Sequence, residues 1–305
     1  MGSCCTIGAV CEHKLTTILF SVLAVSIAMP TLMFWNICKN DVSDLIAGAC
    51  IEHDVDILVL AESEIAESTL LAKLNQGSSI RTFAAIAPSL NKYVKIFTSL
   101  PLNCVRPLID DGRLSITHVT PPIGEEFLLA AMHLPSKAFL DASTQYQSVR
   151  RVRQIIENTE DKLGIDKTVL IGDLNANPFE ESISASDGFH AIMDASIALK
   201  LSRNVQGESR SYFYNPMWNC FGDAEGKPPG TYYYNNSGAN TNYFWNIFDQ
   251  IMFRPGLIRY FKHQNLKLVT SIGNSNLMTN GTINQLFSDH LPLVCTLNTE
   301  YGNGK

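Results

Sequence analysis

The motif GDLNANP, at residues 172–178, follows the apolar run 168–171 and stops it with a glycine. An apolar run of this length before a turn predicts a buried strand that ends at the motif. Side chains alternate along a strand, so Asp173 and Asn175, two residues apart, are expected to point the same way. The motif therefore predicts an acid and an amide presented side by side at a strand end.

A second motif, SDHL at residues 288–291, precedes the apolar run 291–297. This run predicts another strand, and Asp289 and His290 place a carboxylate and an imidazole beside its start. The two motifs lie far apart in the sequence. They constrain the chain to a fold in which distant strand ends meet.

Other apolar runs alternate with amphipathic stretches along the chain. Strands are expected at residues 31–37, 56–60, 247–253 and 266–270, and hairpin strands between residues 81 and 134. Helices are expected at residues 41–50, with Asp41 as N-cap, and at residues 64–74, 142–163 and 189–201. This mixture predicts two packed sheets covered by helices.

Composition limits the class of protein. The chain has 305 residues, of which 46% are hydrophobic, so it can bury a large core, and no linker, repeat or charge run divides it. We expect one domain at residues 29–305. The net charge of -6 counts against a protein that coats DNA without regard to sequence. It does not exclude a local anion site.

The eight cysteines are scattered and form no Cys-x-x-Cys pair, so the sequence does not favour a structural zinc site. Cysteines beside apolar runs are typical of buried reduced thiols. Their pattern favours a reducing compartment, so we expect a cytoplasmic protein.

The N-terminus has no charged residue from 15 to 38, and three explanations stay open. Residues 1–28 could be a signal peptide cleaved after Ala28, or an extension upstream of a natural start at Met29. Residues 15–32 could be a membrane anchor, the only route by which membrane contact is expected. The start also fits a myristoylation pattern. We expect a dispensable leader, with export or membrane association through residues 1–28 as the alternative.

Polar side chains stand at the ends of six predicted strands: Asn36, Glu62, His133, Asp173 with Asn175, Asp249, and Asp289 with His290. Hydrolysis of a phosphate ester needs a hard cation, a nucleophilic water and neutralisation of the phosphoryl oxygens. Mg²⁺ prefers carboxylate and water ligands. The set as a whole therefore predicts metal-assisted phosphoester hydrolysis.

The carboxylates and amides divide this work. Glu62 and Asp289 suit the metal, and Asn36 can orient Glu62 or the waters on the metal. Asp173 can align the attacking water, while Asn175 can donate to a phosphoryl oxygen.

The imidazoles complete the set. His290, paired with Asp249, is held in one tautomer and can donate to the phosphate or take a proton. His133 would stand on the other side of the phosphate. Asp, Asn, Gly and Pro also form turns and caps, so each residue singly has a structural explanation. Six matches in one order are harder to explain in that way.

The segments that carry these residues resemble the endonuclease/exonuclease/phosphatase superfamily, which includes pancreatic deoxyribonuclease, abasic-site endonucleases, neutral sphingomyelinases and inositol-polyphosphate phosphatases. The matching segments are FWNI (34–37), DILVLAE (56–62), MHLPSK (132–137), GDLNANP (172–178), FDQIMF (248–253) and SDHLPL (288–293). The resemblance implies an α+β fold, a four-layer α/β/β/α sandwich of two packed mixed sheets flanked by helices. It also implies phosphoester hydrolysis with a divalent cation, Mg²⁺ or alternatively Mn²⁺.

By resemblance, each residue takes a role. The metal is held by Asn36 and Glu62, with Asp289 completing the metal side. The phosphate is contacted by His133 and Asn175. The water is handled by Asp173, and Asp249 pairs with His290.

The chain departs from its relatives at three points. Ala61 stands where a glutamine is common, and Gln250 stands where an arginine is common. The second change removes a cation and weakens the case for a polyphosphate substrate. No clear carboxylate partner for His133 is found in residues 81–105.

Three functions stay open. The first is a nuclease, in which the aromatic stretch 211–246, Trp218 within it, stacks on bases and Arg254 meets a flanking phosphate. The second is a phosphatase or phosphodiesterase acting on a small molecule or lipid head group. The third is a catalytically silent binding module, which need not keep so complete a polar set. No stable protein partner is implied.

Overall fold

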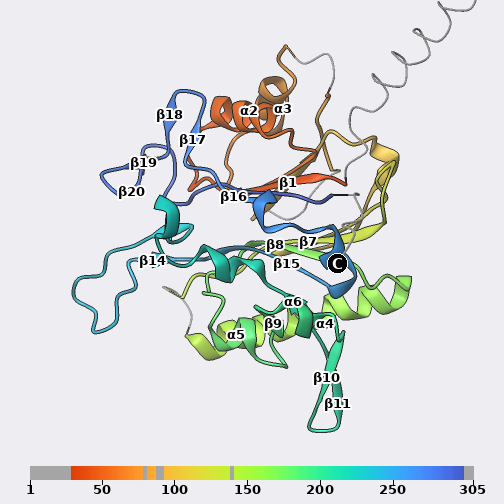
Figure 1. The fold of residues 1–305 in the computed structure, drawn as a ribbon. Coiled ribbons are helices and arrows are strands. Elements are labelled where there is room, and N and C mark those ends of the chain that lie inside the picture. Colours follow the sequence, from red (N-terminus) through yellow and green to blue (C-terminus); the bar gives the residue numbers. More distant parts are fainter. Residues whose placement is uncertain (1–28, 78–80, 87–92, 138–140, 299–305) are drawn as a thin grey trace, which may run out of the picture.

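The computed structural model describes residues 29–77, 81–86, 93–137 and 141–298 (Figure 1). The leader predicted at residues 1–28 lies outside the described residues, and so does most of the anchor predicted at residues 15–32. The end of that segment belongs to a strand, β1 (Thr31–Asn36). Within the described ranges, no helix has the length and apolar character needed to cross a membrane.

The first sheet has six strands and brings three distant segments to one edge. Its order is β16 (Leu266–Leu268), β21 (Leu293–Thr296), β1, β2 (Ile57–Ala61), β4 (Val94–Thr98) and β3 (Ala84–Ala85). The parallel strands β1 and β2 end together, because Asn36 pairs with Ala61. The antiparallel strand β21 begins at the same edge, because Phe34 pairs with Leu293.

The second sheet has seven strands and lines up three more site residues. Its order is β5 (Val105–Asp111), β6 (Leu114–Val119), β7 (Phe127–His133), β8 (Thr168–Asp173), β15 (Asp249–Phe253), β12 (Phe213–Tyr214) and β9 (Ala191–Ile192). The parallel strands β7 and β8 pair His133 with Asp173. The antiparallel strand β15 pairs Asp249 with Asp173, so the three side chains follow one another across the sheet edge.

Helices cover the outer face of each sheet (Figure 1). The helices α2 (Ser43–Glu52) and α3 (Glu67–Leu74) pack on the first sheet, and α4 (Ala142–Leu163) packs on the second. The two sheets share a buried apolar core, which includes Phe34 and Val59 from the first and Leu129 and Ile171 from the second. The predicted four-layer α/β/β/α sandwich is confirmed.

Short elements complete the described chain. They are η1 (Leu102–Cys104), α5 (Glu181–Ser184), α6 (Ala195–Ala198), β10 (Ser202–Val205), β11 (Glu208–Ser211), η2 (Pro216–Cys220), η3 (Ala224–Gly226), β13 (Tyr232–Tyr233), β14 (Trp245–Asn246), η4 (Pro255–Tyr260), η5 (His263–Asn265), β17 (Ser271–Ile272), β18 (Ser275–Asn276), β19 (Met278–Thr279) and β20 (Thr282–Ile283). The hairpin β10–β11 projects from the body of the molecule (Figure 1).

The helix predicted at residues 142–163 has those bounds in the structure. Asp141 caps its start by accepting a hydrogen bond from the Thr144 N–H, and Gly164 ends it in the left-handed conformation. Val149 and Ile156 are fully buried on its apolar stripe. Caps at both ends and a regular stripe made this helix predictable.

Two helix predictions need correction. The helix predicted at residues 189–201 is wrong, because His190 has a φ of +54° and Asp194 caps a new start, which leaves a two-residue strand and one turn of helix. Asp41 is not the N-cap of α2, which begins at Ser43. Its carboxylate instead accepts the Ser43 N–H in the turn before the helix.

Candidate active site

The edges of the two sheets meet, and eight predicted site residues converge there: Asn36, Glu62, His133, Asp173, Asn175, Asp249, Asp289 and His290. The Nε2 of His133 lies 3.6 Å from Glu62 Oε1 and 3.6 Å from Asp173 Oδ2. The Nε2 of His290 lies 4.0 Å from the same Asp173 oxygen. Asn36 donates its Nδ2 to that oxygen at 3.0 Å. Asp173 is therefore the point through which groups from both sheets are linked.

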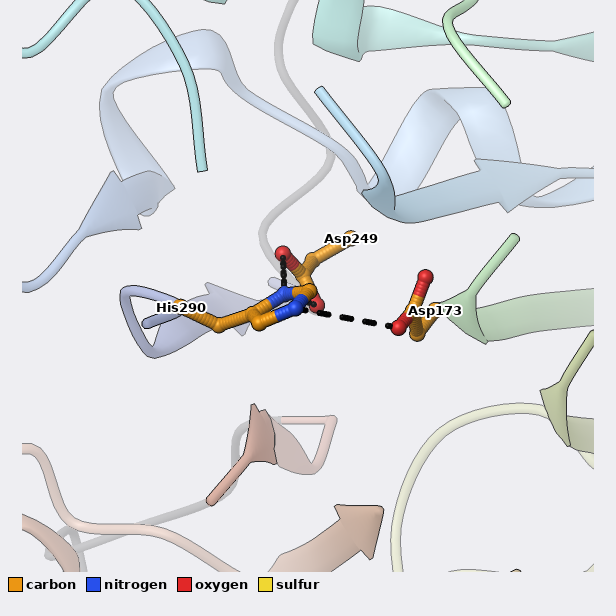
Figure 2. Close-up of side chains that lie close together, drawn as sticks. All are labelled: Asp173, Asp249 and His290. Atoms are coloured by element: carbon orange, nitrogen blue, oxygen red, sulfur yellow. Dashed lines mark hydrogen bonds and ion pairs between the residues drawn. The ribbon is translucent and has the colours of Figure 1, made fainter. Parts of the chain in front are cut away.

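Asp249 holds His290 in a fixed orientation. Its two carboxylate oxygens lie 3.0 and 2.8 Å from His290 Nδ1, and both residues are buried (Figure 2). Burial alone lowers the pKa of His290, but the carboxylates of Asp249, Asp173 and Asp289 outweigh burial and raise the pKa to about 10. At neutral pH His290 is therefore an imidazolium whose Nε2–H faces Asp173.

His133 has the opposite protonation state. Burial lowers the pKa of His133 to about 4, and the charge of Arg113 adds to this effect against the opposing charge of Glu62. Its Nδ1 is buried and has no hydrogen-bond partner within the described part of the chain. At neutral pH the site therefore holds one neutral imidazole and one imidazolium.

Local backbone shape sets the directions of two site residues. Glu62 and Asn175 have φ values of +49° and +47°, which non-glycine residues rarely adopt and which cost conformational energy. The Asn175 N–H donates to Asp173 at 2.9 Å, and its side-chain amide donates to the Leu134 carbonyl at 3.0 Å. Burial raises the pKa of Asp173, while His290 and the Asn175 N–H oppose the rise.

The charge of the site fits a cation. Asp173, Asp249 and His290 each offer one ligand atom within 4.8 Å of the others, so this buried cluster could hold a metal ion. Within this cluster, however, the Nδ1 of His290 is already held by both carboxylate oxygens of Asp249. The side chains of Glu62 and Asp289 are 32% and 30% exposed, and none of the described Lys or Arg residues lies within 4.0 Å of their carboxylates. Both carboxylates can therefore accept a further partner.

Comparisons with known proteins bear on the fold. No protein-family model matches the chain, and no curated protein matches it. Among solved structures, an endonuclease/exonuclease/phosphatase family protein from Leptotrichia buccalis C-1013-b is 13% identical, with a TM-score of 0.52 over 88% of this chain and 100% of that chain. This chain has the endonuclease/exonuclease/phosphatase fold. Truncated Caenorhabditis elegans TDP2 is also similar, at 15% identity and a TM-score of 0.50 over 88% of this chain and 97% of that chain.

Within the endonuclease/exonuclease/phosphatase fold, Arg254 does not lie at the site. It follows Phe253, at the end of β15 opposite Asp249. Its buried guanidinium donates to both carboxylate oxygens of Glu160, at 2.8 and 2.9 Å. The prediction that Arg254 contacts a phosphate is wrong, because the strand carries it away from the site edge and Glu160 occupies its donors.

Trp218 is not joined to the site either. Its indole packs on Phe221 at 6.0 Å and lines a cavity of about 300 Å³ with His190 and Tyr212. No interaction between the described residues links it to the eight converging residues. Its role in substrate binding stays a prediction.

The sequence did not single out Ser288 and Tyr232, which also shape the site. The Ser288 hydroxyl donates to the Asn36 carbonyl at 2.7 Å and accepts the His290 N–H at 3.0 Å. Tyr232 lies with its ring centroid 4.6 Å from that of His290. Ser288 belongs to a motif that was recognised, but Tyr232 is one of several aromatic residues in residues 211–246, and no sequence signal separates it from the others.

Proposed function

We propose that this protein is a Mg²⁺-dependent phosphoester hydrolase, and that it is an endonuclease or exonuclease cleaving phosphodiester bonds by water attack. The observation that carries the proposal is the convergence of His133, His290 and Asn36 on one carboxylate oxygen of Asp173, where the two sheets meet. Titratable groups whose environments push their pKa values apart are typical of acid–base sites. The fold supports the more general part of the proposal, that the protein is an enzyme of the phosphoesterase kind.

The metal has a fitting set of ligands. Glu62 and Asp289, with the amide of Asn36, would hold the cation. A bound Mg²⁺ neutralises phosphoryl oxygens and lowers the pKa of a water molecule. The site carries four carboxyl groups and one imidazolium, so a divalent cation also offsets the surplus of negative charge.

The residues around the cation position supply the rest. Asp173 accepts a proton from the water that attacks phosphorus, and Asn36 holds the accepting carboxylate from the other side. His290 presents its Nε2–H to the phosphate, and the leaving oxygen takes this proton as the P–O bond breaks. His133 can hydrogen-bond to the phosphate without adding charge, because its imidazole is neutral.

An exposed aromatic cluster supports a nucleic acid substrate. Phe179, four residues after Asn175 in the chain, has its ring 5.8 Å from Phe221 and 5.5 Å from Tyr243. Phe179 and Tyr243 are 40% and 59% exposed, so their rings are open to unpaired bases.

The net charge of -6 favours the alternative, a phosphatase or phosphodiesterase on a small molecule or lipid head group. A silent binding module is the least supported function, since it requires no such pairing of imidazoles.

The test is a Mg²⁺-dependent cleavage assay on plasmid, single-stranded DNA, RNA and a generic phosphodiester, with and without chelator. We expect cleavage of at least one substrate, and Asp173→Asn should slow it by about 10³-fold or more through loss of the proton acceptor. Asp166→Asn is the control, because Asp166 is exposed at the start of β8. No cleavage of any substrate, or a wild-type rate for Asp173→Asn, would refute the proposal.

A further inference from the structure

Tyr232 lies between the two strands that carry the Asp249–His290 pair. Its backbone forms an antiparallel bridge with His290, and the Leu291 N–H donates to the carbonyl of Thr231 at 2.8 Å. The Thr231 hydroxyl accepts the Asp249 N–H at 3.1 Å. Residues 231 and 232 therefore tie the first sheet to the second at the site.

The ring of Tyr232 packs against the imidazole ring of His290. Its centroid lies 4.6 Å from that of His290, with an interplanar angle of 39°, and 5.2 Å from that of Phe248, with an angle of 22°. Tilted ring pairs at such centroid distances attract each other. Asp249 holds the edge of the imidazole and Tyr232 holds its face, so the direction of Nε2 is fixed.

The hydroxyl of Tyr232 is a donor that has no acceptor among the described residues. Burial raises the pKa of Tyr232 to about 12, and the charges of Asp289, Asp173 and Cys38 add to the rise, so the hydroxyl stays protonated at neutral pH. Within the part of the chain that the structure describes, the hydroxyl makes no hydrogen bond. A protonated donor of this kind, on a ring packed against His290, is poised for a ligand that brings an acceptor.

We propose that Tyr232 is a catalytic residue: its hydroxyl donates a hydrogen bond to a non-bridging oxygen of the bound phosphate ester, while its ring positions His290. This inference rests on the proposed function, because it requires a phosphate ester at the site. Negative charge grows on the phosphoryl oxygens in the transition state, so a fixed donor lowers the barrier more than it strengthens binding. No covalent step is assigned to Tyr232.

Tyr232→Phe tests the hydroxyl while keeping the ring. On a substrate that the wild type cleaves, we expect kcat to fall by roughly 10- to 100-fold with little change in KM, because the lost contact belongs to the transition state. Tyr233→Phe is the matched control. The Tyr233 ring lies on the other side of the strand and packs 5.2 Å from Trp245, and its loss of a hydroxyl should leave the rate unchanged. Thermal melting confirms that both variants fold.

Phosphorothioate substrates locate the contact. Sulfur is a poor hydrogen-bond acceptor, so the wild type should cleave the diastereomer that has sulfur at the contacted position more slowly than the oxygen substrate. On that diastereomer the rates of the wild type and Tyr232→Phe should differ by less than about twofold, because neither protein can make the contact. The inference would be overturned if Tyr232→Phe kept the wild-type rate, or if Tyr233→Phe lost as much activity. It would also be overturned if Tyr232→Phe remained equally slower than the wild type on both diastereomers. Each of these results still requires an active wild type, so the proposed function would stand. An inactive wild type would instead refute the proposed function.

Discussion

At the scale of single residues, two histidines of one chain take opposite protonation states because their neighbours differ. His290 is surrounded by carboxylates, and Asp249 contacts its Nδ1 directly. His133 has Arg113 close by, and its own Nδ1 has no partner among the described residues. Burial disfavours the charged form of both, so the balance of neighbouring charge decides the outcome.

The raised pKa of His290 predicts a pH-dependent stability in the metal-free protein. The folded pKa of about 10 exceeds the unfolded value of 6.5, so the stabilisation is fully present below pH 6.5 and is lost as the pH rises through 10. Asp249→Asn removes the main carboxylate partner and should flatten this dependence. The measurement is Tm by calorimetry from pH 6 to 10.5 with chelator present.

Lysines and tyrosines that titrate in the same pH range affect the Tm of both proteins equally. The difference in Tm between the wild type and Asp249→Asn therefore removes their contribution. We expect this difference to shrink steadily above pH 7. Parallel Tm curves for the two proteins across the whole range would show that His290 does not carry the charge assigned to it.

At the scale of elements, strand register places the site residues, and Gly172 sets the distance between β7 and β8. A Cβ on Gly172 would lie 1.9 Å from the Met132 carbonyl oxygen, so any other residue would push β8 away from β7. His133 and Asp173, the paired residues at the ends of these strands, would move apart. The glycine of GDLNANP therefore has a packing role as well as a role in the turn.

The far end of β15 allows a prediction about Arg254. Arg254→Ala leaves the Glu160 carboxylate, which is only 11% exposed, without its charged partner, and this should destabilise the protein by about 3 kcal/mol. Because Arg254 lies away from the site, KM for a cleaved substrate should not change at a temperature where the variant is folded. Urea unfolding and steady-state kinetics measure the two effects.

Glu160→Gln serves as the comparison for Arg254→Ala. It should also destabilise, since the charge pair is broken from the other side. A KM that rises for Arg254→Ala alone, with unchanged stability, would return Arg254 to a role in phosphate binding.

At the scale of the whole molecule, the site exists only where the two sheets meet. Asn36, Glu62 and His290 come from the first sheet, and Asp173 and Asp249 come from the second. Like charges are thereby brought together at the expense of stability, as is common at functional sites. A cation bound between the sheets would relieve the repulsion.

Metal binding should therefore stabilise the folded protein. With Mg²⁺ at a hundred times Kd, the free energy of unfolding should rise by about 2.7 kcal/mol, which corresponds to an increase in Tm of about 5 °C. Glu62→Gln should raise the Tm of the metal-free protein and reduce the response to Mg²⁺. Glu64→Gln, at an exposed residue that pairs with Lys39, should keep the full response.

Calorimetry with and without Mg²⁺ measures these shifts, and chelator should reverse them. The expectation fails if Glu62→Gln responds to Mg²⁺ as strongly as the wild type, because the cation would then bind elsewhere.

The sequence by itself determined the local features of this protein. The apolar runs that end in GDLNANP and begin after SDHL specified strands with polar ends, and the stripe and caps of residues 142–163 specified a helix. These signals depend on neighbours in the chain, so periodicity and turn chemistry reveal them. The four-layer arrangement followed from resemblance, and the structure confirmed it.

Tertiary structure decided the rest. Arg254 and Tyr232 both have long side chains that end in a hydrogen-bond donor. The guanidinium of Arg254 is paired with Glu160, whereas the ring of Tyr232 faces His290. Which of them reaches the site depends on strand direction and on contacts between residues far apart in the chain. Protonation states follow the same rule, because burial and neighbouring charge arise only when the two sheets pack.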